Sequence, residues 1–294
     1  MKLLRIVFAA IIARAAMAAA TTTDGADAGA ARPNIVWVMS DDLGWGEVGV
    51  YPSTSPHGRI LTPHLDQFAS EGMRFTDAFA GYTVCAPSRT AFFTGRHSGQ
   101  YVKHGYPGTN LTKAMNVTTT ADILRDAGYA TALIGKAAPL NSPLDLGFDH
   151  FMGQINQGYC HNMYPHFIDE GRGQANVNMT LNWKVKDRAH CMANPQDYNY
   201  TIDSFQNAGL AWLRAHAAAQ HARAQRDEAT QPFFLYLSFT IPHAGGWGTA
   251  PEDPEQGAPV PTDGPYATPG WPDVERDHAA VITPVGFLQS TVSD

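Results

Sequence analysis

Three apolar runs limit most strongly what this 294-residue chain can fold into. Each run is short, almost continuously apolar and rich in β-branched or aromatic side chains, which is typical of strands buried on both faces of a parallel sheet. They lie at residues 34–39, 129–134 and 233–240. Spacing and end signals predict helices over 62–72, 85–95, 120–127 and 201–219, and a further strand over 73–79. This alternation predicts an α/β fold with a mostly parallel central sheet and helices on both faces.

A polar or charged residue follows each of the three strands. Asp41 and Asp42 follow the first strand, Lys136 the second and His243 the third. Because the carboxyl ends of parallel strands share one edge of a sheet, these side chains are expected to converge on a binding site. Adjacent carboxylates repel unless a cation or hydrogen bonds neutralise them, and their hard oxygens suit Ca²⁺ or Mg²⁺. A bare Asp-Asp pair is more often a helix cap or a solvated turn, so the cation hypothesis depends on the other motifs.

The most specific motif of the chain is Cys85-Ala86-Pro87-Ser88-Arg89, which is followed by Thr94-Gly95-Arg96. It resembles the signature of the sulfatase family, a Cys-x-Pro-Ser-Arg core with Thr-Gly-Arg several residues later. Other segments resemble the family at residues 33–44, 62–66, 72–76, 135–136, 147–149, 232–243 and 275–280. The resemblance therefore runs from about residue 32 to about residue 282 and implies the alkaline-phosphatase-like α/β fold.

The resemblance also implies a chemistry for Cys85. In the family this cysteine is oxidised to formylglycine by a formylglycine-generating enzyme, and Cys85, Pro87 and Arg89 match the positions that direct the modification. The formylglycine is hydrated to a gem-diol, one hydroxyl attacks sulfur, and the alcohol leaves. The second hydroxyl then loses its proton, sulfate is expelled and the aldehyde returns. Arg89 is implied to stabilise the gem-diol.

The resemblance assigns the strand-end residues as well. Asp41, Asp42 and residue 85 are implied to hold a divalent cation, Ca²⁺ or else Mg²⁺. Lys136 is implied to bind a sulfate oxygen, and His243 to bind the sulfate group and protonate the leaving oxygen. The expected activity is a sulfuric ester hydrolase, similar to arylsulfatases, whose substrate is a sulfated small molecule or glycan.

Two departures from the family pattern keep alternatives open. Where the family continues after its Gly-Lys pair with an aromatic residue and a histidine, this chain has Ala137-Ala138-Pro139, so position 138 lacks an imidazole. After His243 no segment resembles the one that supplies the other metal ligands and a second lysine, and the family's smaller domain is missing, so the expected fold is incomplete at its C-terminus. The chain is therefore a piece of a working sulfatase, an inactive relative that binds sulfated glycans, or a phosphonate or phosphodiester hydrolase of the same superfamily.

The N-terminus predicts export. Lys2 and Arg5 accompany an apolar stretch over 3–12, and Ala18-Ala19-Ala20 forms a small-residue cleavage site. We expect a signal peptide over 1–20, a linker over 21–31 and a truncated N-terminal sulfatase domain over 32–294. The expected location is secreted or within the secretory pathway, lysosomal or extracellular, or periplasmic in a bacterium. No other stretch is apolar enough for a membrane span, and a net charge of −7 without a long basic run excludes a nucleic-acid partner.

If the protein is secreted, its sequons can carry glycans and its cysteines can form a disulfide. Four sequons mark Asn110, Asn116, Asn178 and Asn199 as candidate glycosylation sites, although sequons also occur by chance. Among the three cysteines, Cys160 and Cys191 are either a disulfide formed in an oxidising compartment or two buried free thiols.

Overall fold

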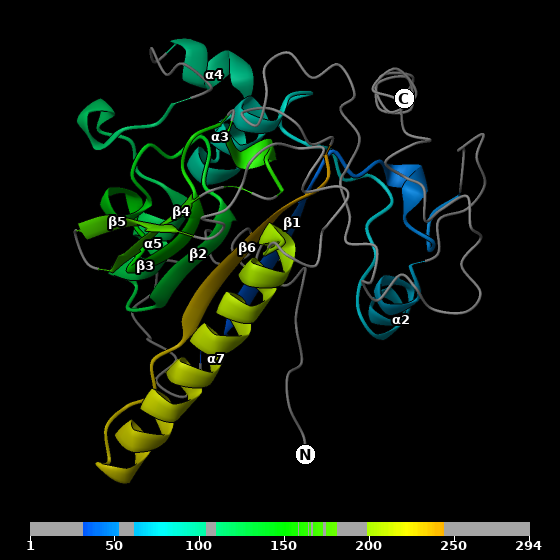
Figure 1. The fold of residues 1–294 in the computed structure, drawn as a ribbon. Helices are drawn as coiled ribbons and strands as arrows, with labels where there is room; N and C mark the ends of the chain where they lie inside the picture. Colours follow the sequence, from blue (N-terminus) through cyan, green and yellow to red (C-terminus); the bar gives the residue numbers. More distant parts are fainter. Residues whose placement is uncertain are drawn as a thin grey trace, which may run out of the picture.

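A computed structural model of the protein describes residues 32–52, 62–103, 110–157, 159–163, 165, 167–172, 175–180 and 199–243. These residues form a six-stranded sheet in the order β1-β6-β2-β3-β4-β5 (Figure 1). The strands are β1 (Ile35–Asp41), β2 (Ala130–Lys136), β3 (His150–Gln154), β4 (Phe167–Arg172), β5 (Ala175–Thr180) and β6 (Phe233–Pro242). The pairs β1–β6, β6–β2 and β2–β3 are parallel, whereas β3–β4 and β4–β5 are antiparallel. The predicted α/β fold with a mostly parallel sheet is confirmed.

The three strands predicted from apolar runs are neighbours in the sheet. In the register Ile35 lies beside Phe234, and Thr131 lies on the other side of Phe234. Successive side chains point to opposite faces, as the pleat requires. Leu133 therefore packs in the core on one face, while Ile134 packs in the core on the other. This double burial explains why these strands read as continuous apolar runs rather than as an alternating pattern.

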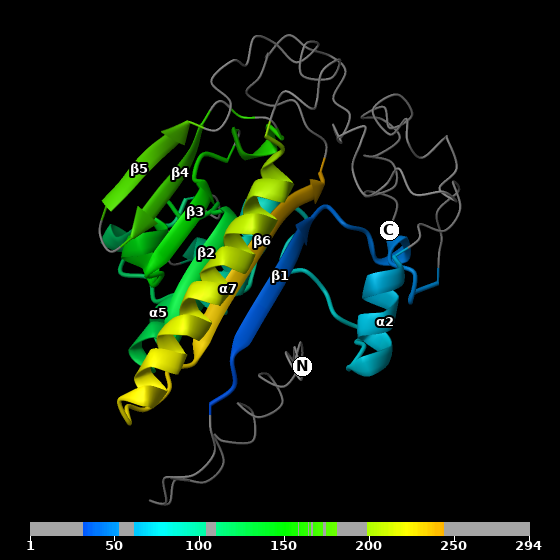
Figure 2. The ribbon, with the colours of Figure 1, turned by 60° about the horizontal axis from the view of Figure 1, so that its bottom comes forward.

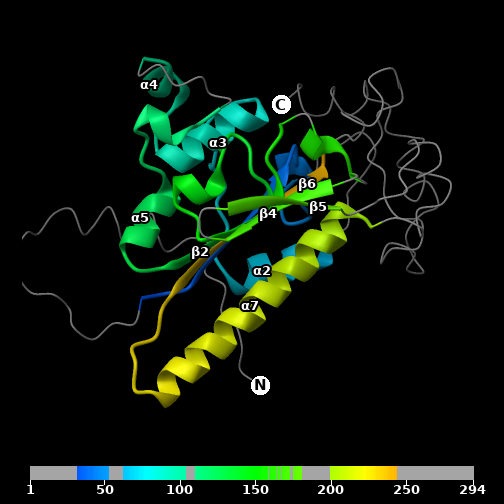
Figure 3. The same ribbon diagram turned by 60° about the vertical axis from the view of Figure 1, so that its left-hand side comes forward.

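Helices cover both faces of this sheet. Helix α7 (Thr201–Gln225) covers one face, and α3 (Cys85–Thr94) and α5 (Thr120–Asp126) cover the other. The remaining helices are α2 (Pro63–Glu71) and α4 (Ser98–Lys103), and the 3₁₀ turns are η1 (Trp45–Glu47), η2 (Lys113–Met115), η3 (Pro143–Leu146) and η4 (Tyr159–His161). Figure 2 shows α7 lying along the sheet, and Figure 3 shows α3 and α5 on the opposite side. Phe93 of α3 and Ala121 of α5 belong to one apolar core, and Phe205 of α7 belongs to the other.

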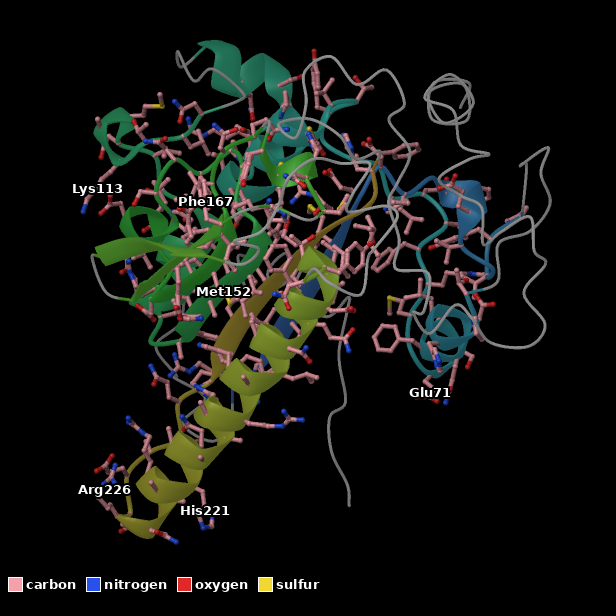
Figure 4. All side chains as sticks on the ribbon, in the orientation of Figure 1. Glu71, Lys113, Met152, Phe167, His221 and Arg226 are labelled. Carbon is pink, nitrogen blue, oxygen red and sulfur yellow. The ribbon has the colours of Figure 1, made fainter. Side chains whose placement is uncertain are left out.

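Local sequence features explain where two of these helices lie. Thr119 and Asp122 form a reciprocal capping box that begins α5, and Gly128, at φ +85°, takes the left-handed conformation just after it. In α7, a Cβ at Gly209 would lie 2.9 Å from Leu237 Cδ2, so this glycine lets the helix approach β6 closely. The far end of α7 leaves the sheet, and His221 and Arg226 extend from it into solvent (Figure 4).

The structure differs from the secondary structure predicted from the sequence in several places. Residues 73–79 form no strand, and Met73 and Phe79 are 67% and 90% exposed, because no described strand lies beside them to pair with. The strands β3, β4 and β5 were not predicted, since they are short and β4 is largely polar and charged. Helix α7 also runs past residue 219 to Gln225, through residues that favour helix.

Several predictions fall outside the described residues. They include the signal peptide, the linker and Cys191, and the part of the chain that follows His243. Within the described residues, no helix combines the length and the hydropathy needed to cross a bilayer.

Candidate active site

The carboxyl ends of β1, β2 and β6 meet at one edge of the sheet. Asp41 is the last residue of β1, Lys136 is the last residue of β2, and His243 directly follows β6. The Nζ atom of Lys136 lies 2.7 Å from Asp41 Oδ2, and His243 Nε2 lies 3.3 Å from Asp42 Oδ2. Parallel pairing thus brings together residues that are about a hundred positions apart in the sequence.

Asp41 is the buried anion of this cluster. Its Oδ1 accepts a hydrogen bond from Arg89 at 3.1 Å, and its Oδ2 accepts one from Lys136. Burial by itself raises the pKa of Asp41, but the positive charges of Arg89 and Lys136 outweigh it and lower the pKa to about 2. The carboxylate is therefore ionised at neutral pH and balances two buried cations.

Arg89 connects α3 to the sheet. Its guanidinium is only 2% exposed and also donates to the hydroxyls of Tyr236, at 3.2 Å, and Ser238 on β6. A buried guanidinium is stable only when its charge and its N–H groups are matched. The Arg89 contacts therefore fix the first turns of α3, and with them residue 85, against the cluster.

Asp42 and His243 form the more accessible side of the site. Asp42 has φ +61°, so directly after β1 the backbone takes a left-handed conformation that few residues other than glycine adopt. Burial raises the pKa of Asp42 despite the opposing charge of His243. Asp42 is 38% exposed and His243 18%, so a substrate can reach this pair more readily than Asp41 or Lys136.

Sequence reasoning missed His161, which lies in η4 and enters the centre of the cluster. Its Nε2 lies 2.9 Å from Lys136 Nζ, and its ring stacks on that of His243. Burial lowers the pKa of His161, and the charge of Lys136 lowers it further, to about 3. Because the imidazole is neutral and the ammonium can only donate, Lys136 donates to Nε2. No local pattern around Tyr159-Cys160-His161 indicates this role, which depends on the packing of η4 over the sheet.

Cys85 opens α3 beside the same cluster. It is half-buried, and its Sγ accepts a hydrogen bond of 3.0 Å from Gln157 Nε2. Both Cys85 and Asp41 interact electrostatically with Lys136, which places residue 85 within range of the buried charges. A helix N-terminus favours negative charge, so this position suits an anionic substrate or nucleophile.

The donor atoms at this edge match a divalent cation only in part. Asp41, His161 and His243 each offer one ligand atom, and these atoms lie within 4.8 Å of one another. Ca²⁺ takes six to eight oxygens. Among the described residues, Asp41 and Asp42 supply carboxylates here, and Asp41 already binds Arg89 and Lys136. The carboxylates fit a divalent cation in charge and type, but they complete only part of its shell.

The remaining predicted sites lie away from this edge or stay untested. Asn110, Asn116 and Asn199 are exposed, and Asn178 lies in β5. Cys160 is a buried free thiol whose Sγ donates to the backbone oxygen of Gln157 at 2.9 Å. Cys191 lies outside the described residues, so the Cys160–Cys191 pairing stays a prediction.

Comparison with known proteins identifies a family for this chain. The Sulfatase family model matches residues 33–276. N-acetylgalactosamine-6-sulfatase of Sus scrofa is 31% identical over 230 residues, covering 72% of this chain and 40% of that protein. Arylsulfatase G of Rattus norvegicus is 40% identical over 236 residues, covering 73% of this chain and 42% of that protein. The chain thus spans about 40% of the length of these relatives.

A solved structure shows the same fold. The PsFucS1 sulfatase from Pseudoalteromonas sp. superposes with a TM-score of 0.56 at 21% identity, covering 89% of this chain and 53% of that one. At this identity the likeness bears on the fold alone, and it agrees with the alkaline-phosphatase-like architecture expected from the sequence.

Proposed function

The chain belongs to the sulfatase family, and on this premise we propose that it is a sulfuric ester hydrolase whose nucleophile is residue 85 after oxidation to formylglycine. One observation carries the proposal. The signature segment begins α3 at Cys85, and its Arg89, one turn further on, is buried against Asp41 of β1 and two hydroxyls of β6. The most specific sequence motif and the three strand ends therefore form one cluster of charges.

The proposed roles follow from what each side chain contacts. His243, at the accessible side of the cluster, binds the sulfate group and gives a proton to the leaving oxygen. Arg89 holds its charge beside residue 85 and stabilises the ionised nucleophile. The Nζ of Lys136 donates to Asp41 and to His161, which leaves one of its three N–H groups for a sulfate oxygen.

We also propose that Asp41, Asp42 and residue 85 hold a divalent cation, Ca²⁺ or else Mg²⁺. When bound, the cation would supply positive charge that lowers the free energy of an ionised nucleophile. Two carboxylates and residue 85 are too few for the six to eight oxygens of Ca²⁺, so water or other parts of the protein complete the shell.

The substrate class is a sulfated small molecule or glycan. Two relatives support this breadth, since one is named for N-acetylgalactosamine-6-sulfate and another, steryl-sulfatase of Mus musculus, for sterol sulfates. A formylglycine-generating enzyme is the proposed maturation partner, because Cys85, Pro87 and Arg89 match the positions that such an enzyme reads. We propose that the chain enters the secretory pathway, where its sequons receive glycans and residue 85 is converted to formylglycine.

Peptide mass spectrometry combined with an ester assay tests the proposal. The chain is expressed with the maturation enzyme, and the tryptic peptide 75–89 is examined for formylglycine at residue 85. Release of sulfate from an aryl sulfate is then compared with turnover of an aryl phosphonate ester, with Cys85→Ala as the control. Formylglycine together with faster sulfate release supports the proposal. Faster phosphonate turnover favours the phosphonate hydrolase, and retention of sulfated ligands without turnover favours the inactive binding relative.

A further inference from the structure

We propose that Gln157 is a positioning residue for the nucleophile, binding both oxygens of hydrated residue 85; this inference rests on the proposed function. The observation behind it is the hydrogen bond of 3.0 Å from Gln157 Nε2 to Cys85 Sγ. In formylglycine the sulfur is replaced by oxygen on the same carbon, so Sγ stands in for one oxygen of the aldehyde or of its hydrate. The amide of Gln157 therefore already faces the position where the reacting oxygen lies.

Backbone contacts hold Gln157 in place. Its carbonyl oxygen accepts the thiol proton of Cys160 at 2.9 Å, and the Cys160 amide donates to Asn156 O at 3.0 Å. At the end of β3, Gln154 Nε2 donates to Tyr159 O at 3.0 Å. These bonds tie the turn to the sheet, so the side chain of Gln157 approaches residue 85 from a fixed backbone.

The side-chain oxygen of Gln157, Oε1, favours the hydrate of residue 85 over the aldehyde. Gln157 Oε1 is buried and has no hydrogen-bond partner among the described residues. A buried acceptor without a donor costs free energy. When water adds to the aldehyde carbon, a new C–O bond forms, a proton passes to the carbonyl oxygen, and the carbon carries two hydroxyls. One hydroxyl can accept from Nε2 while the other donates to Oε1, whereas an aldehyde offers no donor.

Gln157 also supplies a contact that the missing histidine at position 138 cannot make. Position 138, where the family carries a histidine, is a buried alanine with 2% exposure. No imidazole reaches residue 85 from that position. The turn after β3 supplies a neutral amide to the same nucleophile instead, so this chain achieves the contact with a group that does not titrate.

The ratio of diol to aldehyde at residue 85 tests the inference without relying on turnover. The chain is matured with the modifying enzyme, with ¹³C at the cysteine Cβ, and NMR separates the diol carbon from the aldehyde carbon. In Gln157→Leu the ratio should fall roughly 3- to 10-fold, the effect of losing one ordinary hydrogen bond. The matched control is Gln67→Leu on α2, where the amide bonds only to Glu71 at the surface, and its ratio should equal that of the wild type. An unchanged ratio in a folded Gln157→Leu chain overturns the inference.

A second measurement separates this inference from the proposed function. If mass spectrometry finds unmodified cysteine at residue 85, the proposed function fails. A double-mutant cycle of Cys85→Ala and Gln157→Leu on the unmodified chain still decides whether the two side chains interact. The cycle should show a coupling of roughly 2- to 10-fold in the unfolding equilibrium constant. Additive effects would show that Gln157 does not bind residue 85, whether or not formylglycine forms.

Discussion

The imidazole rings of His161 and His243 stack with their centroids 3.8 Å apart and their planes 5° from parallel. The two rings come from η4 and from the end of β6, which are more than eighty residues apart in the sequence. Two protonated rings at this distance would repel each other. The pKa of His161, lowered to about 3 by burial and by Lys136, keeps that ring neutral, so the stack is stable at neutral pH.

Substitutions at His161 separate the role of the ring from that of its nitrogen. His161→Phe retains the stack but removes the acceptor of Lys136, and it should destabilise the protein by about 1.5–3 kcal/mol, the range for hydrogen bonds to charged groups. His161→Gln retains an acceptor oxygen and should cost less. Urea unfolding measures both, with His221→Phe at the exposed end of α7 as the control. A His161→Phe chain as stable as the wild type would contradict the assignment.

Protonation of Asp41 should lower the free energy of unfolding of the protein in acid. Its pKa is about 2 in the folded protein against 3.8 for the free side chain, so the folded state binds the proton less tightly. The contribution is complete above pH 3.8 and is lost as the pH falls towards 2. Its size is about 2–3 kcal/mol, at about 1.4 kcal/mol for each pKa unit. NMR titration of the Asp41 carboxyl, together with urea unfolding from pH 2 to 5, measures it; titration near pH 4 would contradict the buried ion pairs.

Gly135 should tolerate no side chain. It has φ +112°, and a Cβ there would meet the backbone oxygen of Ser238 at 2.0 Å, between paired strands that cannot separate without losing the sheet. Gly135→Ala should cost more than about 3 kcal/mol of stability, since both strain and overpacking act at once. Gly95→Ala is the matched control, because Gly95 also has positive φ, at +63°, but a Cβ there meets nothing within 4 Å. Its cost should stay near 1 kcal/mol, as for αL strain alone. Thermal unfolding of both variants gives the comparison, and equal losses would refute the close approach of β2 to β6.

The two described cysteines should differ sharply in reactivity before maturation. Burial raises the pKa of Cys160 to about 12, and its thiol is bonded to the backbone, so iodoacetamide at pH 8 should leave it unmodified in the folded chain. Cys85 is half-buried and should react first. Peptide mapping after labelling, with and without urea, checks this. Labelling of Cys160 as fast as in urea would show that η4 does not protect it.

The fold and half of the site could be predicted from local sequence. Apolar runs buried on both faces identified β1, β2 and β6, because a strand with no solvent face needs no alternation. The helix signals located α2, α3, α5 and α7 to within a few residues, apart from the end of α7. The ends of those strands then indicated Asp41, Asp42, Lys136 and His243 as one group, and the Cys85–Arg89 motif added the segment that carries the proposed nucleophile.

Tertiary structure alone decided the rest. The strands β3 to β5 form because each pairs with a neighbouring strand, whereas residues 73–79, although richer in apolar residues than β4, lack such a neighbour among the described residues. His161 and Gln157 reach the site from a turn that carries no motif, 25 residues from Lys136 and 72 from Cys85. The buried ammonium of Lys136 and the half-buried side chain of Cys85 hydrogen-bond with whichever polar group the packing places beside them, and packing over such sequence distances leaves no local pattern. The sequence by itself thus determined the three central strands and the residues at their ends. Only the tertiary contacts determined that the neutral side chains of His161 and Gln157 join the cluster.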